Sequence, residues 1–217
     1  MDIIKKLKQE EANSVVSVLA MMSYIPSIGR VLEKGGVDKF EKIMLEEIKK
    51  IEKISSQDKF DSFHDSVIEL IMKRIKTNKG EDMSYGQAQK PINVFFKVYI
   101  DWANKPTLKK SNHLRRLLHV PLDSIGMKEI IEKFPEKYKK YVVSSYDRIR
   151  DNLRKSMKNN GEDFSESALR RIINPSDFSL KSIIGKDMYY AWQYYFRKIH
   201  PEKPVLLDVF WALDRGS

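Results

Sequence analysis

The fold class follows from residues 37–53, which read VDKFEKIMLEEIKKIEK. Apolar side chains recur there at every third or fourth position, at Phe40, Met44, Ile48 and Ile51, and Glu and Lys occupy most positions between them. Since an α-helix has about 3.6 residues per turn, this spacing puts the apolar side chains on one face. The stretch is therefore predicted to form an amphipathic helix that packs against a core.

The same spacing recurs at 60–71 and at 138–153, and no stretch alternates steadily between apolar and polar residues as a half-buried strand does. Glycine, proline and asparagine interrupt these stretches, but the chain has no fixed-period repeat and no long Gly/Ser-rich linker. We therefore expect an all-α fold. Residues 1–217 are expected to form a single helical unit, with two lobes around a cleft as the alternative.

The chain carries a strong positive charge. Its 217 residues include 40 Lys and Arg against 30 Asp and Glu, which leaves a formal net charge of +10. Such a field attracts polyanions such as nucleic acid or an anionic membrane. The cations cluster at 73–79, 105–116 and 148–158. A solvated surface is the simpler interpretation of any single cluster, and contact with phosphate is the functional one.

Several classes of protein are excluded by composition. The chain has no cysteine, which excludes disulfide scaffolds, cysteine-ligated zinc, iron–sulfur clusters and thiol nucleophiles. Its four histidines show no HExxH or comparable spacing, so neither a metal nor another cofactor is expected. No apolar run is seen that approaches the roughly 18 residues of a membrane span. We therefore expect a cytoplasmic monomer without a membrane partner.

The segment that starts at Ser84 carries several signals. Ser84 and Gln87 have the spacing of a capping box, which predicts a helix running toward residue 103. Lys90 lies near its start, and Pro91 predicts that the helix either begins close to Lys90 or bends there. The apolar residues that follow predict a helix central to the core: they are Ile92, Phe95, Phe96, Val98, Tyr99 and Trp102.

A second helix is predicted to begin after Asp123. Residues 118–125 read LHVPLDSI, in which Pro121 stiffens an extended approach and Asp123 is placed to cap the next helix. The simplest interpretation of Asp123 is a helix cap, because aspartate is among the residues preferred at that position.

These two segments resemble the helix-hairpin-helix DNA glycosylases, in particular the 8-oxoguanine glycosylase/lyase branch with its archaeal members. Residues 86–97, GQAQKPINVFFK, resemble the hairpin turn, catalytic lysine and apolar helix of that branch. Residues 119–125, HVPLDSI, resemble its Val-Pro-x-Asp segment. The resemblance implies a glycosylase-like helical fold with a DNA-binding cleft, Lys90 as the Schiff-base lysine and Asp123 as the catalytic aspartate. Lys97 is a competing lysine, two turns further along the helix.

The residue types fit the chemistry. Removing a base builds positive charge on the deoxyribose, and a carboxylate near C1′ stabilises that transition state and helps to deprotonate the attacking group. A lysine amine that is desolvated in an apolar pocket can attack C1′ and form a Schiff base. The Schiff base then permits strand cleavage by β-elimination.

Contacts to double-stranded DNA are expected around the first segment and in the second cationic cluster, from Gly86, Gln87, Gln89, Lys109, Lys110, Arg115, Arg116 and His119. An enzyme of this kind must extrude the base from the stack, and aromatic side chains commonly line the receiving pocket. Four aromatic residues are candidates for that pocket: Tyr85, Phe96, Trp192 and Trp211.

The sequence thus predicts a DNA glycosylase, with lyase activity as an option. The resemblance points to 8-oxoguanine as the excised base, and a hypermodified phage base such as glucosylated hydroxymethylcytosine is the second option. The alternative function is a non-catalytic helical nucleic-acid-binding protein. A helical ribonuclease of the HEPN class is disfavoured, because only three and two residues separate Arg115 and Arg116 from His119.

Overall fold

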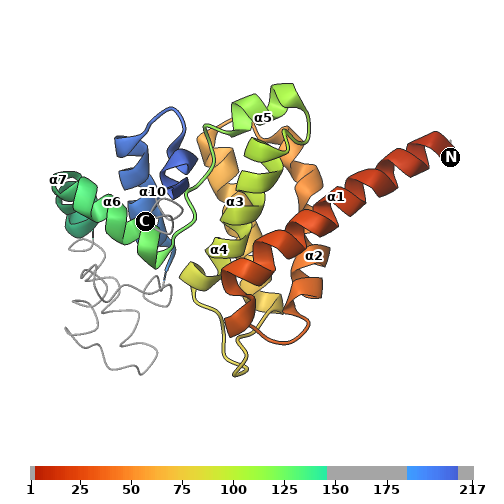
Figure 1. The fold of residues 1–217 in the computed structure, drawn as a ribbon, viewed down its shortest axis with the longest axis horizontal. Coiled ribbons are helices and arrows are strands. Elements are labelled where there is room, and N and C mark those ends of the chain that lie inside the picture. Colours follow the sequence, from red (N-terminus) through yellow and green to blue (C-terminus); the bar gives the residue numbers. More distant parts are fainter. Residues whose placement is uncertain (1–2, 146–184, 210–217) are drawn as a thin grey trace. The chain divides into compact units, whose positions relative to one another are not determined.

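The computed structural model describes residues 3–145 and 185–209. Within these ranges the chain is helical, and its strand-like pairings are two isolated bridges, Leu32 with Thr77 and Lys76 with Asp82. The predicted all-α class is confirmed for this part of the chain (Figure 1).

The chain divides into two compact units, of which unit 1 comprises 1–83 with 88–118, and unit 2 comprises 84–87 with 119–217. Unit 1 contains α1 (Ile3–Ile28), η1 (Gly29–Val31), α2 (Gly36–Glu47), η2 (Ile48–Lys53), α3 (Gln57–Arg74), α4 (Tyr85–Phe96, apart from its first residues), η3 (Lys97–Trp102) and α5 (Leu108–Leu114). Unit 2 contains α6 (Ser124–Lys133), α7 (Pro135–Tyr138), η4 (Lys139–Val143), α10 (Lys186–Ile199) and η7 (Pro204–Val209).

The helix predicted over 37–53 is confirmed and supplies much of the core of unit 1. It is observed as α2 followed by the 3₁₀ segment η2. Phe40 and Met44 are fully buried, and the Phe40 ring centroid lies 5.4 Å from that of Tyr24 and 6.4 Å from that of Phe95. Because these rings come from α1, α2 and α4, the amphipathic face joins three helices.

Helix α1 packs on α2 through one face and exposes apolar side chains elsewhere. Val16, Ala20 and Tyr24 are buried, whereas seven large apolar side chains are exposed. These seven are Ile3, Ile4, Leu7, Val18, Met21, Met22 and Ile25. The N-terminal part of α1 extends beyond the other helices of unit 1 in Figure 1.

Residues 3–31 are long and apolar enough to cross a membrane, judged by length and composition. This corrects the prediction that the sequence holds no segment of that kind. The core helix of a soluble protein and a signal sequence pass the same test, so the finding assigns no location.

The capping box at the start of α4 is confirmed. The Gln87 backbone N–H donates to Ser84 Oγ (3.2 Å), and the Ser84 N–H donates to Gln87 Oε1 (2.9 Å). Reciprocal bonds of this kind satisfy N–H groups that a helix start leaves without intrahelical partners. Pro91 lies inside α4, so the helix begins before Lys90 and continues through the proline.

Two predictions for this region are corrected. Gly86, expected in a hairpin turn, lies in the first turn of α4. The preceding turn is at 77–80, where the Gly80 N–H donates to the Thr77 carbonyl (2.9 Å) and Gly80 has φ of 81°. Trp102, expected in the core, is 62% exposed at the end of η3.

Helix α10 supplies the aromatic core of unit 2. Four aromatic residues at helical spacing are buried: Tyr189, Trp192, Tyr195 and Phe196. Tyr194, on the other side of the helix, is 51% exposed. Trp192 packs on Tyr138, Tyr195 and Phe196, and Tyr189 packs on Tyr85.

Candidate functional site

Lys90 lies in the part of α4 whose other residues are buried. Between Tyr85 and Asn93 every residue except Lys90 is buried, and Lys90 itself is half-buried. Buried Pro91 and Ile92 follow it directly. A lysine in such a position keeps part of its aliphatic stem against the protein.

The glutamines predicted to contact DNA are buried, and so is Gly86. Gln89 Oε1 accepts a hydrogen bond from Asn93 Nδ2 (2.7 Å), and Asn93 Oδ1 lies 2.7 Å from His64 Nε2. Gln87 is engaged in the capping box described above. Buried hydrogen-bonded amides of this kind fix the packing of α3 and α4. Their position does not favour the predicted DNA contacts.

Asp123 is the N-cap of α6, as predicted. Its Oδ1 accepts hydrogen bonds from the backbone N–H groups of Ile125 (2.9 Å) and Gly126 (3.3 Å). The side chain is half-buried at the end of an extended segment. The cap therefore holds the carboxylate in one orientation at the start of the helix.

Gln193 of α10 holds the extended segment that leads to Asp123. Its side-chain Nε2 donates to the Val120 carbonyl (2.9 Å), and its Oε1 accepts the Val120 N–H (2.9 Å). Gln193 and Val120 are both buried. One amide side chain thus pairs with both backbone groups of one residue, as a neighbouring strand would.

Gln193→Ala is expected to lower the free energy of unfolding by about 2–4 kcal/mol, because it leaves two buried backbone groups without partners. Gln193→Glu keeps the acceptor for the Val120 N–H but, as a carboxylate, cannot donate to the Val120 carbonyl. We therefore expect this variant to lower the free energy of unfolding as well. Urea denaturation measures both variants. Gln9→Ala, at an exposed glutamine of α1, is the matched control, with an expected change within about 0.5 kcal/mol. A cost for Gln193→Ala no larger than that of the control would contradict the prediction.

His119, predicted to contact DNA, is buried beside Tyr189. Its Nδ1 lies 2.7 Å from the Tyr189 hydroxyl, and the Tyr189 ring centroid lies 5.2 Å from that of Tyr85. Burial, and secondly the positive charge of Arg197, holds the pKa of His119 well below its usual value of 6.5. Two predicted residues, Tyr85 and His119, are therefore brought together through Tyr189, but His119 is neutral and interior.

The buried His119 predicts acid-sensitive stability. Below about pH 6.5 the unfolded chain protonates this histidine and the folded chain does not, so the unfolded state binds more protons and the free energy of unfolding falls as pH falls. The expected contribution is up to about 1.4 kcal/mol per pH unit below pH 6.5. Urea denaturation at pH 7.0 and 5.5 measures it. His119→Gln should show a smaller pH dependence than the unmodified chain. Equal pH dependence in the two chains would contradict the assignment.

The cations of α5 and the turn after it differ in burial and in their contacts. Arg115 Nε lies 3.0 Å from Asp101 Oδ1, and Arg115 Nη2 donates to the Asp101 carbonyl (3.1 Å). Since its guanidinium is engaged with its own unit, the predicted DNA contact of Arg115 is not favoured. Lys109 and Arg116 are exposed, which suits their predicted role.

The candidates for the base pocket are not brought together. Phe96 lies in the core of unit 1, with ring centroids 5.8 Å from Phe60 and 5.7 Å from Phe63, and Trp192 is fully buried in unit 2. Tyr85 is buried against Tyr189. Trp211 and the third cationic cluster, 148–158, lie outside the described residues.

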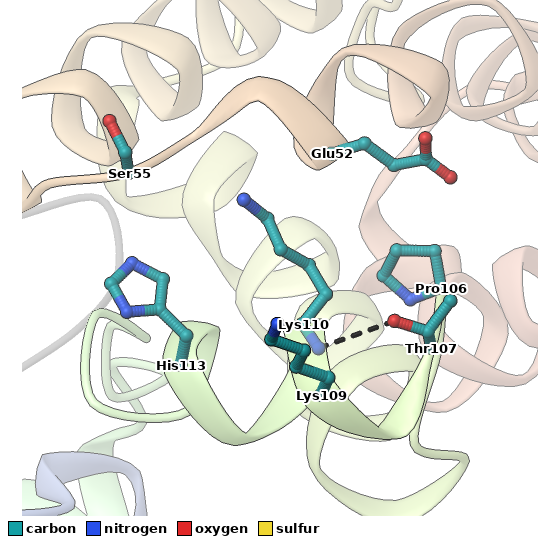
Figure 2. Close-up of a pocket in the computed structure, with 7 residues that line it drawn as sticks. All are labelled: Glu52, Ser55, Pro106, Thr107, Lys109, Lys110 and His113. Carbon is teal, nitrogen blue, oxygen red and sulfur yellow. Dashed lines mark hydrogen bonds between the residues drawn. The ribbon is translucent and has the colours of Figure 1, made fainter.

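Unit 1 holds a pocket of about 590 Å³ that contains two of the predicted DNA-binding lysines (Figure 2). Seven residues line it: Glu52, Ser55, Pro106, Thr107, Lys109, Lys110 and His113. The first two come from the end of η2 and the segment after it, and the others from α5 and the loop before it.

Sequence reasoning missed two polar residues of unit 2 and the outline of this pocket. Gln193 meets Val120 across 73 positions of sequence, and no local spacing signals such a contact. Asp208, in η7, is a buried carboxylate that no motif singled out. Ser55 and His113 both line the pocket, although no sequence pattern predicts that they lie near each other.

Among the described residues no cluster of three or more His, Asp or Glu side chains is arranged to hold a metal ion. No protein-family model, curated protein or solved structure that was compared with the chain matches it. The candidate residues of unit 1 are therefore Lys90 on α4 and the exposed cations. Those of unit 2 are Asp123 at the start of α6 and the side chains that hold the segment before it.

Proposed function

We propose that the protein is a DNA glycosylase that removes a damaged or modified base from double-stranded DNA and can cleave the strand through a lysine Schiff base. Asp123 carries the proposal. Its carboxylate stands at the start of a helix, after an extended Val-Pro-Leu segment that Gln193 holds from the side. The glycosylases that this chain resembles have a Val-Pro-x-Asp segment in which the aspartate opens a helix in the same way.

The role proposed for Asp123 is electrostatic. As the bond between base and sugar breaks, positive charge develops on the deoxyribose, and a fixed carboxylate near C1′ lowers the energy of that transition state. Because its Oδ1 already accepts two backbone N–H groups, the carboxylate needs little reorganisation when the charge appears. The same group is suited to accept a proton from the attacking amine or water.

The role proposed for Lys90 is nucleophilic. Its amine would attack C1′, the base would leave, and the resulting Schiff base would allow β-elimination of the 3′ phosphate. The half-buried position of Lys90 among buried neighbours supports this role, since a lysine nucleophile must be partly desolvated. The reaction requires Lys90 and Asp123 to reach the same deoxyribose.

Trapping with borohydride tests the proposal. Duplexes that each carry one candidate base are incubated with the full chain, and release of the base is measured with and without borohydride. The set includes 8-oxoguanine, uracil, an alkylated purine and glucosylated hydroxymethylcytosine. We expect release of at least one base and a covalent protein–DNA adduct with borohydride. Absence of release from every duplex, with binding intact, would overturn the proposal.

The substrate proposed first is 8-oxoguanine, on the resemblance, and a hypermodified phage base is second. The same set of duplexes separates the two. A DNA-repair enzyme should release 8-oxoguanine and not the glucosylated base. An antiviral enzyme should release the glucosylated base and not 8-oxoguanine.

A non-catalytic nucleic-acid-binding protein is the second candidate function. The net charge of +10 and the exposed Lys109 and Arg116 favour it, because phosphate contacts alone supply affinity. A protein of this kind would bind DNA with strong salt dependence, release no base, and be indifferent to substitution of Lys90 or Asp123.

A further inference from the structure

The pocket of unit 1 has two unlike ends. Figure 2 shows Ser55 and His113 at one end and Glu52 and Pro106 at the other, with the Lys110 side chain extending between them. One end therefore offers hydrogen-bond donors and the other a carboxylate. A ligand with a single anionic group fits this distribution of charge.

Lys110 is anchored within the pocket wall. Its Nζ donates to the Ile54 carbonyl (2.6 Å). Since an ammonium carries three N–H donors, this bond fixes the group and leaves two donors for a ligand. Exposed Lys109 adds a second positive charge, and Lys59 adds a third, because its Nζ donates to Ser55 Oγ (3.3 Å).

The hydroxyl groups of the pocket are oriented by the protein. Thr107 Oγ1 accepts the backbone N–H of Lys110 (3.3 Å), the bond drawn in Figure 2, and its own O–H remains a donor. Ser55 Oγ accepts from Lys59 in the same manner. Serine and threonine hydroxyls donate readily to phosphate oxygens, alongside lysine ammonium groups.

Glu52 limits what the pocket can take. Its carboxylate repels a second phosphate at that end, so a continuous nucleic-acid backbone fits less well than a single phosphate group. A phosphate monoester carries a charge of about −1.5 to −2 at pH 7, against one charge for a diester in a strand. The lysines at 59, 109 and 110 therefore favour the monoester.

We infer that this pocket binds a phosphate monoester, and specifically the 5′-phosphate at the end of a DNA strand. The strand-end assignment rests on the proposed function. In β-elimination a base takes the C2′ proton, the C3′–O bond breaks, and the phosphate leaves on the 5′ end of the downstream strand. Binding of a monoester as such does not depend on that reaction.

Fluorescence anisotropy with two labelled duplexes tests the inference. The duplexes share one sequence without any modified base, and a recessed 5′ end carries either a phosphate or a hydroxyl group. We expect the full chain to bind the phosphorylated duplex about tenfold more tightly, a difference that does not involve catalysis. Equal affinity for the two duplexes would overturn the inference and leave the glycosylase proposal untouched.

Variants assign the preference to the pocket. Lys109→Gln and His113→Asn change exposed side chains and should each remove most of the preference for the phosphorylated duplex. Lys79→Gln, at an exposed lysine of unit 1 that does not line the pocket, is the matched control and should keep it. Thermal unfolding checks that all three chains are folded. An unchanged preference in both pocket variants would overturn the inference.

Two competitors distinguish the source of the phosphate. Inorganic phosphate should weaken binding of the phosphorylated duplex more than that of the hydroxyl duplex, whereas chloride at equal ionic strength should weaken both alike. If inorganic phosphate weakens binding of the two duplexes equally, as chloride does, the inference is overturned. A deoxynucleoside 5′-monophosphate that binds as tightly as the phosphorylated duplex would overturn the strand-end assignment.

Discussion

Lys90→Gln is expected to abolish the adduct trapped by borohydride and to slow base release by about 10³-fold or more. Glutamine keeps a polar end on a side chain one atom shorter, but it has neither the charge nor an amine to attack C1′. The substitution lies at a half-buried position and should change the free energy of unfolding by no more than about 1 kcal/mol. Trapping and single-turnover base release measure the effect, and urea denaturation checks the fold.

Lys97 provides the matched control for this variant. It lies two turns along the chain from Lys90, and its Nζ is 5.0 Å from the centroid of the Trp102 ring. Lys97→Gln removes one positive charge from the same region, so it should lower DNA affinity slightly and keep the adduct. An adduct of full yield with Lys90→Gln, or its loss with Lys97→Gln, would reject Lys90 as the nucleophile.

Asp123→Asn should slow base release by about 10²- to 10³-fold while leaving the fold intact. Asparagine caps a helix about as well as aspartate, so the bonds to the N–H groups of Ile125 and Gly126 can persist. The variant therefore removes the negative charge and keeps the cap. Single-turnover base release at saturating enzyme measures the chemical step.

Asp123→Ala separates the two roles of the aspartate. It removes the cap as well as the charge and should cost about 1 kcal/mol in the free energy of unfolding. If Asp123 serves only as a cap, Asp123→Asn should be fully active and Asp123→Ala should be impaired in proportion to its lost stability. That pattern would reject a catalytic role.

Local signals in the sequence predicted the local structure. The spacing of Phe40 and Met44 predicted a buried helix face, and the pair Ser84 and Gln87 predicted a capping box. Asp123 predicted the start of a helix. Each of these depends on residues two to four positions apart, where the geometry of one helical turn decides the contact. These are the parts of the candidate site that the sequence could supply.

Contacts between distant segments could not be predicted in this way. Helical spacing assigns Trp102 and the aromatic residues of 189–196 to particular helix faces, but it does not show which face packs against another element. In the structure Trp102 is exposed and Trp192 is buried. The pairing of Arg115 with Asp101 and the burial of His119 likewise depend on packing, which spacing along the sequence does not report.

The segment before Asp123 has a consequence for the order of folding. The bonds that hold it come from Tyr189 and Gln193, which lie 70 and 73 positions from their partners His119 and Val120. Closing loops of that length costs conformational entropy, so such contacts form after local helices. In refolding from urea, we expect far-UV circular dichroism to recover before base release does, because the segment before the aspartate is held in place only when α10 has packed against it.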